Sequence, residues 1–443
     1  MIRAALLGFV LLGSLQQTLA LAGDEPFRPA SSVATVRTQI EQLPTDDIWW
    51  TVNGPDMAWN NRNLQRIFPT VPVYRAGAVS ELKARPNPAI ARFPVATPSG
   101  RVPFQAFLDS DASSTMGVVI LHRGDIVFQN YPRQEPYEKP ILWSVTKAFV
   151  GTLVAILEDR GQVDVDQPIE TYVPRLRDSA FAGVTVRNFL DMATGVDCPE
   201  NYEDRDSCYY RYSMTVGDGF WTADSPDDPY EYLAGVKAGR WAEQGTAFSY
   251  SGVNTFILGW LVEEVTGMPF QDALSREIWT RIGAENDAAM LAPRYGVPNT
   301  HGGLLARLRD VARFGLLFTP SWDTVTSTRI VSDRYLETLL HGGNPDLLRN
   351  ARFGAPKDPD VRHNVYQWDL VFDNDDVYKG GWAGQGLLVN PRRDLVAAWT
   401  GYSSGDEQRD IDLLGPVREL LNALYGENGA GGEPSAPGAS TTR

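Results

Sequence analysis

The chain of 443 residues is 43% hydrophobic and 21% charged, a composition typical of a globular protein with a large core and two closely packed subdomains. Its formal net charge of -15 excludes nucleic acid as an expected partner, and because the acidic residues form no long block we interpret the charge as favouring solubility. The four histidines, at positions 122, 301, 341 and 363, show no paired ligand spacing, so the sequence predicts no metal site.

The N-terminus predicts the compartment. Met1-Ile2-Arg3 is positively charged, an apolar run extends from Ala4 to Leu15, and Ala20-Leu21-Ala22 has the pattern of a cleavage site, so residues 1–22 are interpreted as a signal peptide. The apolar run is shorter than the roughly 20 residues that span a bilayer, and no later segment is long and apolar enough. We therefore expect a periplasmic or secreted protein without a stable membrane span.

Residues 23–103 are rich in Pro, Asn and Trp and have weak periodicity, which predicts an extended N-terminal segment packed on the main domain and without chemistry of its own. Further along, hydrophobic periodicity and capping residues predict a series of elements. They are two strands around a turn in 116–131, helices over 148–157, 185–192, 254–265, 270–282 and 304–318, a hairpin over 386–399, and a last helix over about 408–425. Residues 426–443 are too polar to bury and are expected to be a disordered tail.

Strands at both ends of the chain with helices between them predict an α+β fold, in which an antiparallel sheet assembled from distant segments is flanked by helices and a helical domain is inserted. The long aromatic and acidic stretch 196–245 is a candidate substrate-specificity loop. It contains the only two cysteines, Cys198 and Cys208, which can close a disulfide in an oxidising compartment; two buried free thiols are the alternative.

The motif Ser144-Val145-Thr146-Lys147 carries the first chemical signal. At the start of a helix, residues i and i+3 share a face, so the hydroxyl of Ser144 and the amine of Lys147 are neighbours. A serine hydroxyl is a weak nucleophile, and a partly desolvated lysine can lose its proton and act as its base. The helix N-terminus also leaves backbone N–H groups free for a developing oxyanion. The motif predicts a serine hydrolase, although a lone Ser-x-x-Lys is common on ordinary solvated helices.

A competing nucleophile is Ser403, in the elbow-like sequence Gly401-Tyr402-Ser403-Ser404-Gly405. An α/β-hydrolase needs its catalytic histidine after the serine in chain order, and no histidine follows Ser403. We therefore interpret this segment as a loop turn.

Two further motifs support Ser144. Tyr250-Ser251-Gly252 precedes a buried helix, and Lys379-Gly380-Gly381 enters a strand where glycine lets a substrate lie against the backbone. We expect a cationic Lys379 beside Tyr250 to lower the pKa of the phenol. Tyrosine turns and glycine bends are common separately, but the order Ser-Lys, Tyr, Lys-Gly-Gly is much harder to explain by chance.

With these motifs the chain resembles the serine beta-lactamase-related family, which contains class C beta-lactamases, D-amino-acid-specific peptidases, esterases and 6-aminohexanoate-dimer hydrolases. The resemblance covers 104–425 and extends to segments such as Gly161 to Pro168 and Thr185 to Gly195. It implies a beta-lactamase/transpeptidase-like fold. The sequences around His122 and Tyr250 are more similar to the esterases and 6-aminohexanoate-dimer hydrolases.

The resemblance also implies a mechanism without metal or organic cofactor. Ser144 attacks a small ester, amide or short peptide substrate and forms an acyl-enzyme, Lys147 and Tyr250 share the proton transfers, and which of the two is the acylation base stays open. The backbone N–H groups of Ser144 and Trp382 form the oxyanion hole.

Lys379, Gly380, Gly381 and Gly252 are expected to line the substrate site. Two departures argue against a true beta-lactamase: Gly252 stands where the class C pattern has Asn, and Gly380 stands where Lys-Thr-Gly has Thr. D-amino-acid-specific peptidase, penicillin-binding protein or beta-lactamase activity, and a non-catalytic binding protein, stay as alternatives. The oligomeric state is left open.

Overall fold

The computed structural model describes residues 53–405 except 99 and 295, residues 413–426, and three isolated residues at 32, 34 and 38. The chain divides into two units, Met1–Glu41 and Gln42–Arg443, and everything below concerns the second. The predicted signal peptide, residues 23–52 of the N-terminal segment apart from 32, 34 and 38, and the polar tail beyond residue 426 lie outside the described residues.

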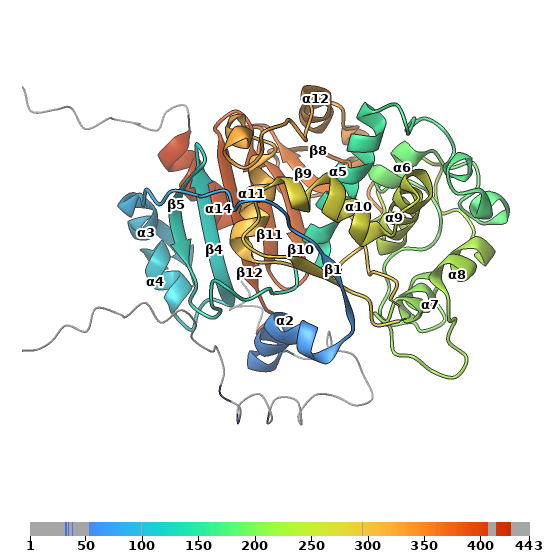
Figure 1. Ribbon diagram of the computed structural model, residues 1–443, viewed down its shortest axis with the longest axis horizontal. Helices are drawn as coiled ribbons and strands as arrows, with labels where there is room; N and C mark the ends of the chain where they lie inside the picture. Colours follow the sequence, from blue (N-terminus) through green and yellow to red (C-terminus); the bar gives the residue numbers. More distant parts are fainter. Residues whose placement is uncertain are drawn as a thin grey trace, which may run out of the picture. The chain divides into compact units, whose positions relative to one another are not determined.

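A seven-stranded antiparallel sheet forms the centre of the fold, in the order β5-β4-β12-β11-β10-β9-β8 (Figure 1). Its strands are β4 (Thr115–His122), β5 (Asp125–Asn130), β8 (Val361–Val365), β9 (Trp368–Phe372), β10 (Val377–Gly381), β11 (Gln385–Asn390) and β12 (Leu395–Gly401). The early strand β4 pairs with the late strand β12, with Val119 opposite Ala398. The predicted assembly of the sheet from distant segments is therefore confirmed.

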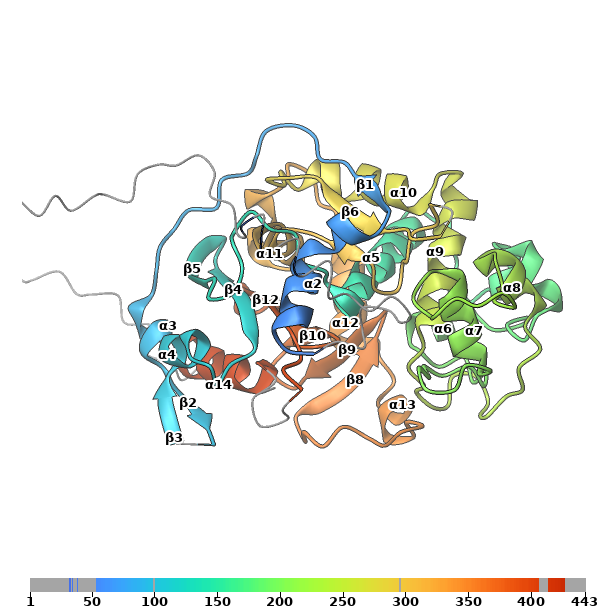
Figure 2. The same ribbon diagram turned by 90° about the horizontal axis from the view of Figure 1, so that it is seen from below.

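Helices cover both faces of this sheet. Alternate residues of one strand point to opposite sides, so each strand contributes side chains to both helix–sheet interfaces. Val118 and Ile120 pack with α3 (Pro88–Arg92), α4 (Phe104–Asp109) and α14 (Leu414–Tyr425), which lie together on one side in Figure 2. Val119 and Leu121 point to the other side, toward α5 (Thr146–Asp159) and α11 (Leu308–Leu316).

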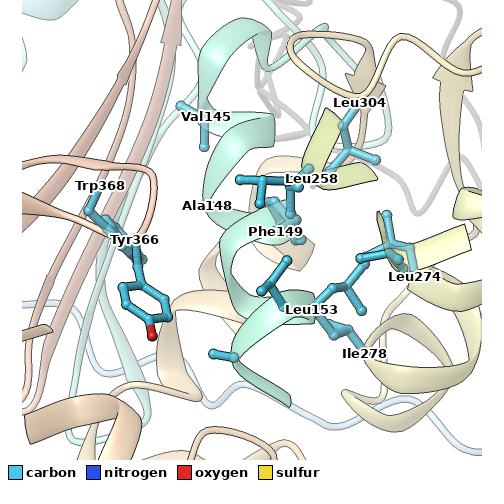
Figure 3. Close-up of a cluster of buried hydrophobic side chains, with 14 of the residues drawn as sticks. Val145, Ala148, Phe149, Leu153, Leu258, Leu274, Ile278, Leu304, Tyr366 and Trp368 are labelled. Atoms are coloured by element: carbon cyan, nitrogen blue, oxygen red, sulfur yellow. The ribbon is translucent and has the colours of Figure 1, made fainter. Parts of the chain in front are cut away.

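The helical part is inserted between β5 and β8, and α5 is its central helix. Side chains around α5, among them Phe149 and Leu153, pack against α9, α10 and the sheet-side residue Trp368 (Figure 3). The remaining helices of this part and its surroundings are α6 (Val186–Leu190), α7 (Cys208–Thr215), α8 (Pro229–Gly235), α9 (Gly252–Thr266), α10 (Phe270–Glu277), α12 (Asp333–His341) and α13 (Pro345–Arg349). A well-packed α5 holds its first turn, which carries Lys147, in a fixed position.

The structure differs from the sequence-based expectation in three segments. The described part of the N-terminal segment is not extended throughout: it forms α2 (Pro55–Ile67), which buries Met57 and Leu64, and the strands β1 (Thr70–Val73), β2 (Pro94–Thr97) and β3 (Gly100–Pro103). The amphipathic pattern of 304–318 begins with a short strand, β7 (Leu304–Leu305), which joins β6 (Ala288–Leu291) and β1 in a small sheet. The stretch 196–245 contains α7 and α8 and is irregular only in part. Among the described residues, no helix is long and apolar enough to cross a membrane.

Candidate active site

Ser144 and Lys147 meet at the beginning of α5. Ser144 lies in a 3-10 turn, Trp143–Val145, that leads directly into the helix, and the preceding Trp143 has a left-handed φ of 48°. Such a conformation is uncommon for a residue with a side chain and is typical of functional turns. The Nζ atom of Lys147 donates hydrogen bonds to Ser144 Oγ at 2.9 Å and to the backbone carbonyl of His301 at 2.8 Å. The predicted nucleophile and its candidate base are therefore in direct contact.

The environment of Lys147 favours its neutral form. Its side chain is completely buried, and this desolvation lowers the pKa of Lys147 to about 8, with a smaller opposing effect from the Glu200 carboxylate. At neutral pH roughly a tenth of such a lysine is unprotonated and can accept a proton. A lysine exposed on the surface would stay protonated at neutral pH, whereas the buried Lys147 can serve as a base.

Tyr250 lies at the end of the segment before α9, with its ring centroid 4.8 Å from Lys147 Nζ and 5.1 Å from Lys379 Nζ. The expectation that Lys379 lowers the pKa of this phenol is wrong. Burial raises the pKa of Tyr250 well above 10, the carboxylates of Asp369 and Glu200 raise it further, and a hydrogen bond with Ser144 opposes them. Tyr250 is therefore a neutral phenol at neutral pH, suited to donating a proton rather than removing one.

Asp369 explains why Lys379 does not have the expected effect. Lys379 Nζ donates to both carboxylate oxygens of Asp369, at 2.8 and 2.7 Å, as well as to Tyr250 Oη at 3.1 Å and the Gly380 carbonyl at 2.9 Å. The negative charge on Asp369 compensates the positive charge on Lys379. Sequence reasoning missed Asp369, because it is a single acidic residue in the strand β9.

His301 lies behind Lys147 in a buried polar cluster that the sequence analysis also missed. Its imidazole contacts Tyr212 Oη at 2.8 Å through Nδ1 and Asp218 Oδ2 at 3.0 Å through Nε2. The ring is held on both sides, so the backbone carbonyl that accepts from Lys147 is held as well. The sequence pattern assigns His301 no role, because the four histidines show no ligand spacing. Among the described residues, no group of three or more His, Cys, Asp or Glu could hold a metal ion.

The stretch 196–245 supplies further side chains to this cluster besides Tyr212 and Asp218. Glu200 Oε1 lies 3.9 Å from Lys147 Nζ and accepts a hydrogen bond from Tyr209 Oη at 3.1 Å. Tyr209 Oη in turn lies 2.9 Å from Tyr202 Oη, which donates to Asp218 at 3.3 Å. The stretch predicted to control specificity thus reaches the candidate base through Glu200. No spacing in the sequence pairs Glu200 with Lys147.

The candidate glycines allow close approaches between segments. A Cβ atom on Gly252 would lie 2.8 Å from both His301 Cδ2 and Tyr209 Oη, so the imidazole and the phenol occupy the space that a larger side chain would need. A Cβ atom on Gly381 would lie 2.6 Å from the carbonyl oxygen of Leu142, two residues before Ser144. The end of β10 can therefore lie directly against the turn that carries the nucleophile.

The other predicted residues have clear positions. The Trp382 ring, 43% exposed, packs edge-on against Trp143 with centroids 5.1 Å apart. Cys198 and Cys208 form a disulfide, which links the segment before Glu200 to the start of α7. Ser403 lies after β12 near α2, where its backbone carbonyl accepts a hydrogen bond from Gly54 at 2.7 Å.

The sequence model of the Beta-lactamase family matches residues 104–415. The chain belongs to the beta-lactamase family. This membership confirms the resemblance inferred from the three motifs, and with it the predicted fold class and a serine hydrolase as the type of enzyme.

Individual relatives are consistent with this family membership. A 6-aminohexanoate-dimer hydrolase from Paenarthrobacter ureafaciens is 29% identical over 390 residues, which cover 84% of this chain and 95% of the relative. A solved structure of a candidate 6-aminohexanoate-dimer hydrolase from Bacillus anthracis has a TM-score of 0.71 at 19% identity and covers 86% of this chain and 95% of its own. A family VIII carboxylesterase has a TM-score of 0.52 at 17% identity, with 70% and 94% covered. At these identities the two structures show the shared fold.

Proposed function

We propose that this member of the beta-lactamase family hydrolyses small esters or amides through an acyl-enzyme on Ser144. The observation that carries the proposal is the 2.9 Å contact between Ser144 Oγ and the Nζ atom of a fully buried Lys147. A serine activated in this way attacks carbonyl carbon atoms, and both esters and amides present such a carbon. The names of the similar hydrolase and carboxylesterase are consistent with these two bond types.

The mechanism begins with neutral Lys147, which takes the proton of Ser144 as Oγ bonds to the carbonyl carbon. The electron pair of the carbonyl moves onto its oxygen and returns when the bond to the leaving group breaks. Tyr250, a neutral phenol in hydrogen-bond contact with Ser144, supplies the proton to the leaving group and regains one from Lys147. Water then attacks the acyl-enzyme along the same proton route in reverse. The raised pKa of Tyr250 and the lowered pKa of Lys147 thus favour Lys147 as the acylation base.

The developing oxyanion would be held by the backbone N–H groups of Ser144 and Trp382. The first lies in the turn at the N-terminus of α5, where backbone donors have no partner within the helix. The second follows directly on β10, which Gly381 brings against the backbone of Leu142. Two donors on rigid elements stabilise charge that appears only in the transition state.

Two exposed aromatic side chains near the catalytic cluster support substrates with an apolar body. Trp382 is 43% exposed and Tyr202 is 41% exposed, and both belong to segments that contact the cluster. Exposed aromatic rings stabilise apolar groups by burying their surface. Gly252 and Gly380 lack the side chains that the class C pattern and the Lys-Thr-Gly motif provide, so neither position favours beta-lactamase or carboxypeptidase activity.

Labelling and turnover test the nucleophile. Ser144→Ala should abolish hydrolysis of a nitrophenyl ester and labelling by a fluorophosphonate probe, and the matched variant Ser403→Ala should retain both. Mass spectrometry of the labelled peptide identifies the residue directly. Full activity in Ser144→Ala, or a label on Ser403, would reject the assignment.

We also propose that the protein is exported. The signal-peptide pattern of residues 1–22 supports this, and so does the Cys198–Cys208 disulfide, since disulfides persist mainly in oxidising compartments. Expression of the full chain in a Gram-negative host, followed by fractionation and N-terminal sequencing, tests the proposal. Recovery in the periplasm or medium with the N-terminus near residue 23 is expected; an intact N-terminus in the cytoplasmic fraction would contradict it.

A further inference from the structure

The edge of β10 that faces the nucleophile is occupied by a carboxylate of the protein itself. β10 pairs with β9 only at Val377 and Tyr378, and the register continued by one step places Lys379 opposite Asp369. Within the described part of the chain, no strand pairs with β10 beyond Tyr378 on the β9 side. The Asp369 side chain fills the gap, and its Oδ2 accepts a hydrogen bond from the Gly380 backbone N–H at 2.9 Å.

The hydrogen-bonding capacity of Lys379 is used up by these contacts. An ammonium group has three protons, and Nζ already contacts the Asp369 carboxylate, the Gly380 carbonyl and Tyr250 Oη. Its side chain is 1% exposed, whereas that of Asp369 is 26% exposed. A molecule that enters the site therefore meets a carboxylate at this position, with the ammonium behind it.

The spacing of backbone N–H groups along β10 determines which part of a substrate lies beside Asp369. Backbone N–H groups two residues apart point to the same edge of a strand, about 7 Å apart, so those of Gly380 and Trp382 share this edge. If Trp382 holds the oxyanion, the Gly380 N–H lies about 7 Å from the carbonyl under attack. A substrate carboxylate at that distance would otherwise receive a charge-assisted hydrogen bond.

We propose that Asp369 is a specificity-determining residue that occupies the anion position of the active site, so that the enzyme selects substrates without a carboxylate near the scissile bond. The proposal rests on the proposed Ser144 hydrolase function and defines its substrate class as neutral esters and amides. A substrate carboxylate would lie against Asp369 and farther from Lys379, whose protons are already used, so the repulsion by the nearer like charge exceeds the attraction by the ammonium behind it. Glu200, 3.9 Å from Lys147 Nζ, adds a second negative charge to the same site.

Removing the Asp369 charge tests the proposal. Two chromogenic substrates share one acyl chain: nitrophenyl methyl glutarate is neutral, and nitrophenyl hydrogen glutarate carries a carboxylate a few bonds from the ester. The wild type should hydrolyse the neutral substrate with the higher kcat/KM. Asp369→Asn removes the negative charge and keeps an acceptor oxygen, whereas Asp369→Ala also makes Lys379 and the Gly380 N–H available. The anionic-to-neutral ratio of kcat/KM should therefore rise in both variants, and at least tenfold in Asp369→Ala.

The control is Asp373→Asn, which removes the same charge from the turn of the same hairpin, where Asp373 lies 3.7 Å from Arg362 and makes no contact with Lys379. In Asp373→Asn the anionic-to-neutral ratio of kcat/KM should equal that of the wild type. Measurement in high salt screens the overall net charge and leaves the short-range contact. A ratio that stays within threefold of the wild type in both Asp369 variants, or an equal change in Asp373→Asn, would overturn the proposal.

Failure of this inference can be distinguished from failure of the proposed function. Fluorophosphonate labelling of Ser144 and turnover of the neutral ester report on the hydrolase itself in every variant. If the wild type shows neither, the proposed function is rejected together with the inference. If the wild type shows both and the ratio does not respond to Asp369, only the role of Asp369 is rejected.

Discussion

Replacement of Lys147 by methionine should abolish ester hydrolysis and stabilise the protein at neutral pH. Methionine has a similar length and no charge, so it removes both the base and its desolvation cost. Lys147 has a pKa of about 8 in the folded protein against an ordinary value of 10.5. The unfolded chain therefore binds more protons between these two values, and the stability of the wild type rises with pH across that window.

The size of the stability change follows from the pKa shift of Lys147. At about 1.4 kcal/mol per pH unit, the burial of Lys147 costs about 3 kcal/mol below its folded-state pKa and nothing above its unfolded-state pKa. Lys147→Met avoids this cost but leaves the buried His301 carbonyl without its donor, a loss of about 1–2 kcal/mol. The variant should thus be more stable than the wild type by about 1–2 kcal/mol near pH 7 and less stable by a similar amount near pH 10.5.

Urea unfolding of the two proteins at several pH values between these limits measures the difference. Titration of all other groups cancels in the comparison, and Lys357→Met, which changes an exposed lysine, is the control for loss of one charge. A stability difference between wild type and Lys147→Met that stays constant with pH would refute the reasoning, because it would mean that folding does not shift the pKa of Lys147.

Three further outcomes follow from the site. The kcat/KM for a neutral ester should rise with pH and level off near pH 8, since Lys147 acts as a base only when unprotonated; a limb near pH 4–5 would indicate a carboxylate base instead. Gly252→Asn should destabilise the protein by about 1–3 kcal/mol in thermal unfolding, because its Cβ would overlap His301, and should confer no nitrocefin hydrolysis; an unchanged melting temperature would contradict the packing argument. Replacing Cys198 and Cys208 by serine should cost about 3 kcal/mol of stability in urea, and equal stability with and without the disulfide would contradict this.

Periodicity and chain order predicted much of the fold. The buried strands and helices of the main domain follow repeats of two and about 3.6 residues, so the hairpin around Gly124 and the buried helix after Gly252 were found from local patterns. The helix α2 in the N-terminal segment was not predicted, because it takes its stability from packing Met57 and Leu64 against the main domain, and local periodicity carries little of that information.

In the candidate site, the sequence predicted which residues take part but not their ionisation states. Ser144 and Lys147 are one helical turn apart, and Tyr250 and Lys379 belong to short motifs, so the sequence alone predicted the candidate nucleophile, its neighbours and a serine hydrolase as the type of enzyme. Their ionisation was not determined, because a pKa depends on burial and on charges that arrive from other segments. The acidic turn at 373–376, with Asp369 four residues before it and Lys379 three residues after it, is the sequence signal for that pair, because residues that flank a hairpin turn face each other across the two strands.

Only the tertiary structure decided that Lys379 is neutralised by Asp369, that Glu200 and His301 surround Lys147, and that Gly252 leaves room for an imidazole. Each of these contacts joins residues from separate elements, in most cases tens of residues or more apart in the chain. Such contacts are set by the packing of the sheet against α5 and α9. The sequence by itself predicted a serine hydrolase, and the packing determined the ionisation of its candidate catalytic groups, because burial and charges from other segments set their pKa values.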